Sequence, residues 1–177
     1  MAVIEAIETV YLEADTAYLT FSGIPATYEH LQIRMSARTL RAHYVDSILL
    51  YLGTGGGAVD TGSNYAYHNM YGESSSTVTS TALSGQSNIK VSSVAGNSAA
   101  DRAAYGSIIV DILDYANANK NTTTAASGGS IGTSSSLVIF QSGLWDNTGA
   151  VTSIQVSGAS ASFMRGSEFT LYGLNSS

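Results

Sequence analysis

The segment Tyr28-Glu-His-Leu-Gln-Ile-Arg-Met-Ser-Ala-Arg38 decides the fold class of this chain. Side chains of a β-strand point alternately to the two faces of a sheet, and residues 30–38 alternate strictly between polar and apolar. The pattern therefore predicts a strand over 28–38 with one face in a core and a basic outer face. The apolar set is Leu31, Ile33, Met35 and Ala37, and the polar set is His30, Gln32, Arg34, Ser36 and Arg38.

Length and composition restrict the class of protein. A chain of 177 residues predicts one domain, 1–177, large enough to bury a core, and the absence of cysteine excludes disulfides and thiolate metal sites. Only 11% of the residues are charged and the net charge is −6, so nucleic acid is not an expected partner. The N-terminus lacks a basic segment followed by an apolar run, and no run reaches the roughly 20 residues of a membrane-spanning helix. We therefore expect neither a secretory signal nor a membrane partner.

Further strands are predicted on both sides of the opening segment, separated by turns rich in Gly, Ser and Asn. Residues 46–52 are uniformly apolar but too short for a helix, so this strand, with Leu49, is expected to be buried on both faces. Almost no helix signal is present, which indicates an all-β fold, a β-sandwich or jelly roll. The predicted strands are 3–12, 17–22, 46–52, 107–115, 120–126, 135–142, 151–157 and 167–173. Residues 107–115 could also form a helix, but their β-branched content favours a strand, and residues 65–71 are either a strand or the wall of a pocket.

Two parts of the chain are expected to lie outside this framework. Residues 1–15 can form an N-terminal arm. Residues 72–104 are small and polar, which predicts a long flexible insertion that binds a partner or is disordered alone. A short helix from Asn97 to Ala104 is one option within it.

The sequence contains one motif of a known enzyme class. Residues 58–63, Ala-Val-Asp-Thr-Gly-Ser, match the core of aspartic proteases, whose chemistry needs two such carboxylates sharing a proton. The chain has a single copy, so only a homodimer could be active. The alternative is a polar turn in which Asp60, Thr61 and Gly62 form local hydrogen bonds, and we favour it. No catalytic residue and no enzymatic activity are therefore expected.

Metal and cofactor sites are weakly supported. His30, His43 and His68 could form a metal site with Asp46, but no two of these histidines have the spacing that brings side chains together on a helix. No phosphate-binding glycine loop precedes a helix signal. We expect neither a metal nor a cofactor.

A cluster of aromatic residues lies between positions 65 and 71. Tyr65, Tyr67 and Tyr71, together with Trp145, could stack on sugar rings. Such residues are more often anchors of a core or a subunit interface. Both interpretations remain open at this point.

Charge is unevenly distributed along the N-terminal part. Glu5, Glu8, Glu13 and Asp15 occur without a basic residue, and Arg34, Arg38 and Arg41 follow without an acidic residue among them. One interpretation is an intramolecular strand pair with opposite charges facing each other. The other is an acidic arm of one subunit that docks on the basic strand of the next.

Several segments of the C-terminal third show a recognisable pattern of strand and turn residues. They are 142–148 (Ser-Gly-Leu-Trp-Asp-Asn-Thr), 150–154 (Ala-Val-Thr-Ser-Ile), 162–163 and 169–174 (Phe-Thr-Leu-Tyr-Gly-Leu), with 21–25, 28–31 and 64–69 upstream. These segments resemble a family of small virion proteins of tailed bacteriophages, which commonly shows a Gly-Leu-Trp, Asn-Thr, Ala-Ile-Thr-Ser-Ile run and ends in Leu-Tyr-Gly-Ile. Gly149, where an alanine is expected, and the Asn-Ser-Ser tail depart from the pattern.

The resemblance implies a structural protein made in the host cytoplasm and incorporated into the virion. The short chain favours a capsid cement or decoration protein, which self-associates as a homotrimer and binds the outer surface of the major capsid protein shell. The alternative is a tail or fibre-tip module that binds host surface glycans through Tyr65, Tyr67 and Tyr71.

Overall fold

The structure is a computed structural model that describes residues 3–75, 77–97, 104–132 and 136–176. In this part of the chain it contains strands and no helix, as the sequence predicts. The strands are β1 (Val3–Tyr11), β2 (Tyr18–Ser22), β3 (His30–Ala37), β4 (Val45–Gly53), β5 (Tyr65–Glu73), β6 (Val78–Gln86), β7 (Ile89–Ala95), β8 (Gly106–Leu113), β9 (Thr122–Ile131), β10 (Ser136–Trp145), β11 (Ser153–Gly158) and β12 (Glu168–Asn175).

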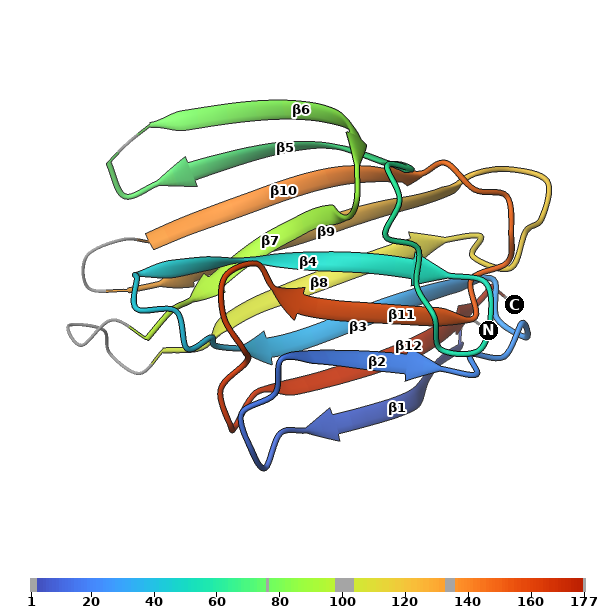
Figure 1. Ribbon diagram of the computed structural model, residues 1–177, viewed down its shortest axis with the longest axis horizontal. Helices are drawn as coiled ribbons and strands as arrows, with labels where there is room; N and C mark the ends of the chain where they lie inside the picture. Colours follow the sequence, from blue (N-terminus) through green and yellow to red (C-terminus); the bar gives the residue numbers. More distant parts are fainter. Residues whose placement is uncertain (1–2, 76, 98–103, 133–135, 177) are drawn as a thin grey trace.

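The strands form two sheets of unequal width packed face to face. The wide sheet has the order β1-β12-β3-β8-β9-β10-β5-β6, and the narrow sheet has the order β2-β11-β4-β7 (Figure 1). All strand pairs within the two sheets are antiparallel. The chain is therefore an all-β sandwich of the jelly-roll-like kind, which confirms the predicted fold class.

The core lies between the two sheets and is built from alternate residues of their strands. In β3, Leu31, Ile33, Met35 and Ala37 are buried and the residues between them face away, as the alternation predicts. Burial of large apolar side chains from both sheets supplies the main favourable term for folding. The largest fully buried side chains include Trp145, Tyr65, Tyr115, Phe21, Phe163, Phe169, Ile48, Leu50 and Leu52.

All strands predicted from the sequence are present, but the prediction for residues 72–104 is wrong over most of its length. Residues 78–86 form β6 and residues 89–95 form β7, so this region is part of both sheets. β7 is almost wholly buried against the wide sheet. β6 is largely exposed, which explains why no hydrophobic alternation marks it. The option of a short helix falls mainly on residues 98–103, which lie outside the described residues.

Two smaller expectations also need correction. β4 buries one face only: Ile48, Leu50 and Leu52 are inaccessible, whereas Leu49 is half-buried on the other side. The N-terminal segment is not a detached arm, because β1 pairs with β12 along the margin of the wide sheet. β1 and β2 follow each other in the chain but belong to different sheets.

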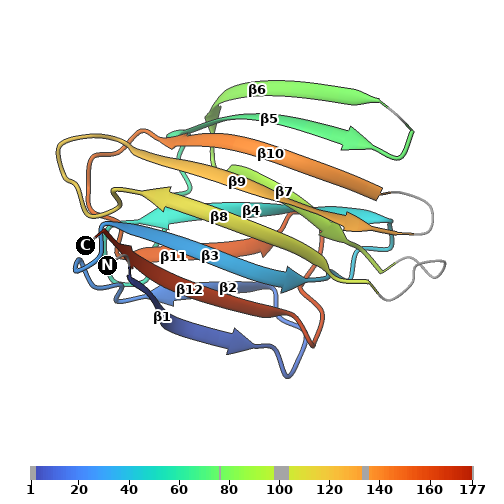
Figure 2. The ribbon, with the colours of Figure 1, turned by 180° about the vertical axis from the view of Figure 1, so that it is seen from behind.

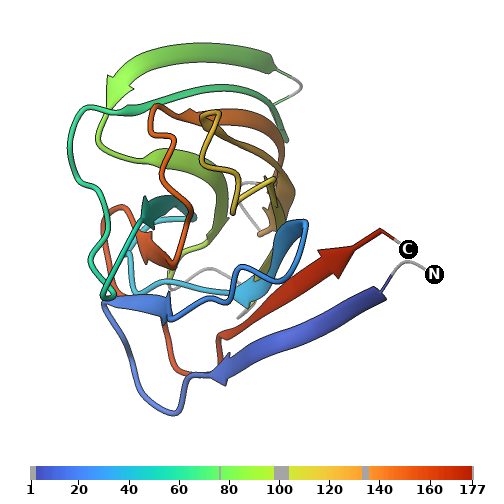
Figure 3. The same ribbon diagram turned by 90° about the vertical axis from the view of Figure 1, so that its right-hand side faces the viewer.

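The wide sheet extends past the narrow one at its margins (Figure 1). β5 and β6 form one margin, and β12 and β1 project at the other, with the two chain ends side by side (Figure 3). The face of the wide sheet turned away from the narrow sheet is called the outer face below, and Figure 2 views the molecule from that side. Among the described residues, no helix is long and apolar enough to cross a membrane.

Candidate functional site

The outer face is crossed by a continuous row of directly opposed residues, one from each of its eight strands. Directly opposed side chains on one face of an antiparallel pair are in contact distance, so the row is a physical unit. The residue from β3 is the basic Arg34, and the residues from β10 and β5 are the large apolar Phe140 and Met70. The row is Thr9, Thr170, Arg34, Ile109, Ser127, Phe140, Met70 and Ser80.

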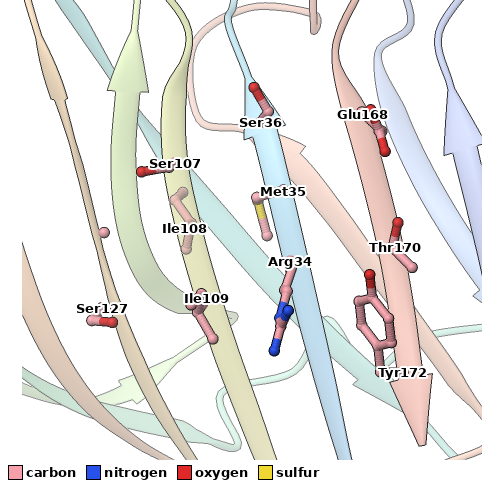
Figure 4. A pocket seen from close by; sticks show the side chains of 11 residues that line it. Arg34, Met35, Ser36, Ser107, Ile108, Ile109, Ser127, Glu168, Thr170 and Tyr172 are labelled. Atoms are coloured by element: carbon pink, nitrogen blue, oxygen red, sulfur yellow. The ribbon is translucent and has the colours of Figure 1, made fainter. Parts of the chain in front are cut away.

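Where small side chains lie along and next to this row, the outer face has shallow hollows. Ser36, Ser107 and Ser127 lie on neighbouring strands and form the floor of a hollow of about 440 Å³. We call it the Arg34 hollow, because Arg34 and Tyr172 form one end of it. Figure 4 shows Glu168 and Ser36 at the opposite end.

Arg34 is held in place by its neighbours on the outer face. Its Nε donates a hydrogen bond of 2.8 Å to Oε1 of Gln32, and Nε2 of Gln32 donates one of 2.7 Å to Oδ1 of Asp111. The guanidinium carbon also lies 5.1 Å from the centre of the Tyr172 ring, in a cation–π arrangement. These contacts orient the guanidinium beside the hollow.

The other half of the outer face is apolar. Met70, Val138, Phe140 and Ile131 lie on β5, β10 and β9, and their exposed fractions range from 49% to 70%. Phe140 and Met70 are directly opposed across β10 and β5 and border a second hollow, of about 510 Å³. We call these four residues the apolar patch. Large apolar side chains this exposed and this close together mark an interaction surface.

The three arginines predicted to form a basic wall do not share a face. Arg34 is exposed on the outer face, but Arg38 is 6% exposed and its Nε donates to the Gly96 carbonyl oxygen at 3.0 Å. Arg41 follows β3, and its Nη1 donates to the Val45 carbonyl oxygen at 2.9 Å and lies 3.7 Å from Oδ1 of Asp46. Arg38 and Arg41 therefore stabilise the end of β3, and the prediction of a three-arginine wall is wrong.

The acidic residues of the N-terminus lie at the opposite margin from β6. β12 separates β1 from β3, so Glu5 and Glu8 do not face Arg34 across a strand pair. Glu5 accepts a hydrogen bond of 3.0 Å from the Tyr28 hydroxyl. Glu13 lies 4.0 Å from the Arg165 guanidinium. The predicted intramolecular pairing of these acids with the basic strand is absent from the described residues.

The aromatic cluster faces the interior. Tyr65 is 1% exposed and stacks on Trp145 at a centroid distance of 6.2 Å, and its hydroxyl accepts a hydrogen bond of 3.0 Å from the Leu52 amide. Tyr67 packs against the core, and Tyr71 lies on the same side of β5. Burial raises the pKa of the Tyr65 hydroxyl above its ordinary value. These three tyrosines do not form an exposed platform for a sugar ring.

The aspartic-protease motif is a structural turn. Oδ1 of Asp60 accepts a hydrogen bond of 2.7 Å from the Gly62 amide, as the polar-turn interpretation expects. Oδ2 accepts from Asn64 Nδ2 at 2.8 Å and from Trp145 Nε1 at 2.9 Å. Both carboxylate oxygens are thus occupied by the protein's own donors.

The three histidines belong to different elements of the fold, and His43 lies in the loop between β3 and β4, next to Tyr44. His30 and His68 are on β3 and β5 of the wide sheet, and Nδ1 of His30 accepts a hydrogen bond of 3.0 Å from the Asp114 amide. Asp46 is fully buried in the narrow sheet. In the described ranges no three His, Cys, Asp or Glu side chains are placed to hold a metal ion.

Comparisons with known proteins show similarity in structure only. No protein family model and no curated protein matches the chain. Among solved structures, the chain is similar to an exo-inulinase from Aspergillus awamori (TM-score 0.42, 10% identity) over 98% of its own length but 29% of that enzyme. It is also similar to the sialidase module CBM40 of Ruminococcus gnavus bound to α2,6 sialyllactose (TM-score 0.36, 12% identity, 95% and 93% covered). A third is galectin LEC-6 of Caenorhabditis elegans (TM-score 0.33, 9% identity, 95% and 96% covered).

These similarities concern fold class and leave function open. The residues of the outer face were also hard to find from the sequence. Leu137-Val-Ile-Phe140 is a continuous apolar run, so the pattern alone predicts a core strand and does not separate buried Ile139 from exposed Val138 and Phe140. Among the strands of the outer face, only the one that contains Arg34 has an alternation that predicts which side chains point outward.

Proposed function

We propose that this protein is a non-enzymatic structural protein of a tailed-bacteriophage virion that binds the outer surface of the major capsid protein shell. The observation that carries this proposal is the apolar patch of Met70, Ile131, Val138 and Phe140. A protein that stays monomeric gains nothing from four large apolar side chains exposed together, whereas a permanent contact buries them. The sequence resemblance to small virion proteins supports the choice of partner.

The chemistry of the apolar patch suits a capsid partner. The centre of a stable protein interface is depleted in charged residues and enriched in aromatic residues and Met. Phe140 and Met70 provide such a centre, and Ser127 and Ser80 flank them in the row. Arg34 and Glu168 lie further along the face, beyond Ser127. Asp111 also lines the hollow beside Phe140 and Met70, but its Oδ1 already accepts a hydrogen bond from Gln32.

Self-association is proposed to occur through the free edges of the wide sheet. A ring of three subunits needs two different surfaces on each subunit, and β6 and β1 are the two terminal strands of this sheet. β6 contains no charged residue and no proline, and its one irregularity in register with β5 lies near its end, opposite Tyr65 and Tyr67, so most of the strand is regular and open to pairing. β1 carries Glu5 and Glu8, and these acids would meet no like charge on β6.

The absence of enzymatic activity is part of the proposal. The one carboxylate with an enzyme-like motif, Asp60, is fixed by Gly62, Asn64 and Trp145 of its own chain. A proton shared between two copies would have to compete with these three donors for the carboxylate oxygens. The alternative of a tail-tip module was based on a set of exposed tyrosines. Tyr65 is buried, and Tyr67 and Tyr71 are half-buried on the inner side of β5, so they do not form that surface.

The test is binding of purified protein to phage capsids that lack it. Wild type should saturate the capsids, and its copy number per virion should be comparable with that of the major capsid protein. The double variant Phe140→Ser, Met70→Ser should lose most of this occupancy. Tyr18→Ser is the matched control, because Tyr18 is 56% exposed but lies on β2 of the narrow sheet. Equal occupancy by all three proteins, or no binding of wild type, contradicts the proposal.

A further inference from the structure

We propose that the Arg34 hollow is a binding site for a saccharide that carries a carboxylate group. The site lies on the β12, β3, β8 and β9 part of the outer face, beside the apolar patch, and shares none of the four patch residues. Because Ser127 lies in the hollow and also next to Phe140, the inference concerns the free protein, before any docking through the patch. Three observations support the site: the Nη donors of Arg34 that remain available, the polar side chains around them, and the volume of the hollow.

The guanidinium of Arg34 is held in one orientation, but only its Nε forms a hydrogen bond among the described residues. Its Nε is engaged by Gln32, and Tyr172 lies against the group. Its two Nη atoms have no hydrogen-bond or ion-pair partner among the described residues. A guanidinium presents paired donors in a planar fork that matches the two oxygens of a carboxylate. Because Gln32 and Tyr172 already restrict the side chain, little conformational freedom remains to be lost on binding.

The rest of the hollow suits the hydroxyl groups of a sugar. Ser36, Ser107 and Ser127 provide hydroxyls that can donate or accept, and Glu168 provides acceptors only. Figure 4 places Glu168 at the end opposite Arg34. A ligand with its carboxylate at Arg34 and its hydroxyls toward Glu168 therefore meets complementary groups at both ends. Ile109, which is 40% exposed, offers an apolar contact for the C–H face of a ring.

The volume of the hollow favours a saccharide over a small carboxylate such as acetate as the ligand. At about 440 Å³ it falls in the range of pockets that bind whole small molecules, which is roughly 300–1,000 Å³. A single acetate or one acidic side chain would occupy only the end near Arg34. A sugar acid also reaches the serines of the floor, so its affinity should exceed that of acetate.

The experiment measures binding of small probes to the purified protein by amide chemical-shift changes. The probes are glucuronate and galacturonate, with glucose and galactose as uncharged counterparts and acetate as the bare carboxylate. At least one uronate should shift residues of the Arg34 hollow, with a Kd of about 1 mM, as expected of an open site. Its uncharged counterpart and acetate should bind about tenfold more weakly, because a charge-assisted pair or the sugar contacts are then missing.

Two variants complete the test. Arg34→Gln should weaken uronate binding about tenfold without unfolding the protein, since Arg34 is exposed. Arg165→Gln is the control, because Arg165 is also an exposed arginine but lies in the turn before β12. The proposal is overturned if neither uronate shifts the lining residues, if Arg34→Gln binds as wild type does, or if glucose, galactose or acetate bind as tightly as the uronates.

Discussion

Nε1 of Trp145 donates a hydrogen bond of 2.9 Å to Oδ2 of Asp60, which lies 85 positions earlier in the chain. The bond ties the loop after β4 to the end of β10. Asp60 also accepts from Asn64 and from the Gly62 amide. A motif associated with catalysis thus serves here to fix a loop between the two sheets.

The first prediction concerns the stability of this loop. Asp60→Ala removes three accepted hydrogen bonds and leaves the Trp145 indole without its partner, so we expect a loss of about 2–4 kcal/mol in the free energy of unfolding. Asp60→Asn keeps an acceptor and should cost about 1 kcal/mol. Urea unfolding measures both. Equal stability of Asp60→Ala and wild type would contradict the structural role, and peptidase activity lost in Asp60→Asn would restore the catalytic one.

The second prediction is a pH dependence. Burial alone would raise the pKa of the Asp60 carboxyl, but hydrogen bonds from Trp145, Asn64 and Gly62 outweigh it and hold the pKa below its ordinary value of 3.8. A lowered pKa in the folded state means that the carboxylate contributes stability above the unfolded value and loses it as the pH falls through the folded value. The stability difference between wild type and Asp60→Asn should therefore narrow below about pH 4. A difference that is constant down to pH 2 would show that the charge contributes nothing.

The third prediction compares two neighbouring tyrosines. Tyr65→Phe leaves the buried Leu52 amide without its 3.0 Å acceptor, and we expect a loss of about 1–3 kcal/mol in the free energy of unfolding. Tyr67→Phe removes a hydroxyl that has no hydrogen-bond partner among the described residues, so its effect should be small. Thermal and urea unfolding of both variants check this. A larger loss of unfolding free energy for Tyr67→Phe than for Tyr65→Phe would contradict the structural role given to the Tyr65 hydroxyl.

The fourth prediction uses two consecutive residues of β3. Met35 is 4% exposed, so Met35→Asp places an unpaired charge in the core and should abolish soluble expression. Ser36 faces the outer side directly opposite Glu168, so Ser36→Lys introduces a charge of complementary sign and should leave the fold intact with a change of about 0.5 kcal/mol. Circular dichroism of the soluble fraction measures the outcome. Soluble, β-rich Met35→Asp protein would refute the assignment of the two faces.

The fifth prediction concerns self-association. Lysines on an exposed edge strand oppose pairing with another chain. If the wild type is the proposed trimer, Ser80→Lys combined with Ala82→Lys should therefore give a monomer. Analytical ultracentrifugation measures the mass. Tyr18→Lys on β2 is the control and should retain the wild-type mass. A trimer in the β6 variant would exclude β6 as the contact edge, and a monomeric wild type would exclude the trimer itself.

The sequence was sufficient for the fold class but not for the site. Alternation around Arg34 predicts β3 with the correct buried and exposed faces, because a half-buried strand leaves that pattern in its own residues. Whether Arg38 is buried depends on Gly96 and Asn97, which follow β7 and are distant in the chain, and no local pattern encodes that contact. The same holds for the outer-face row, whose residues come from eight strands scattered over the chain.

The unequal width of the two sheets has a consequence for how the molecule opens. β6 has no narrow-sheet strand packed beneath it along most of its length, and its residues are largely exposed. Its amides can therefore exchange with solvent through local opening that leaves Leu31, Ile33 and the rest of the core closed. β3 and β8, buried on one face, should exchange only on global unfolding. If a neighbouring subunit binds β6 as proposed, it binds the least protected strand of the fold. Hydrogen exchange at the β6 amides should then slow more than at any other strand.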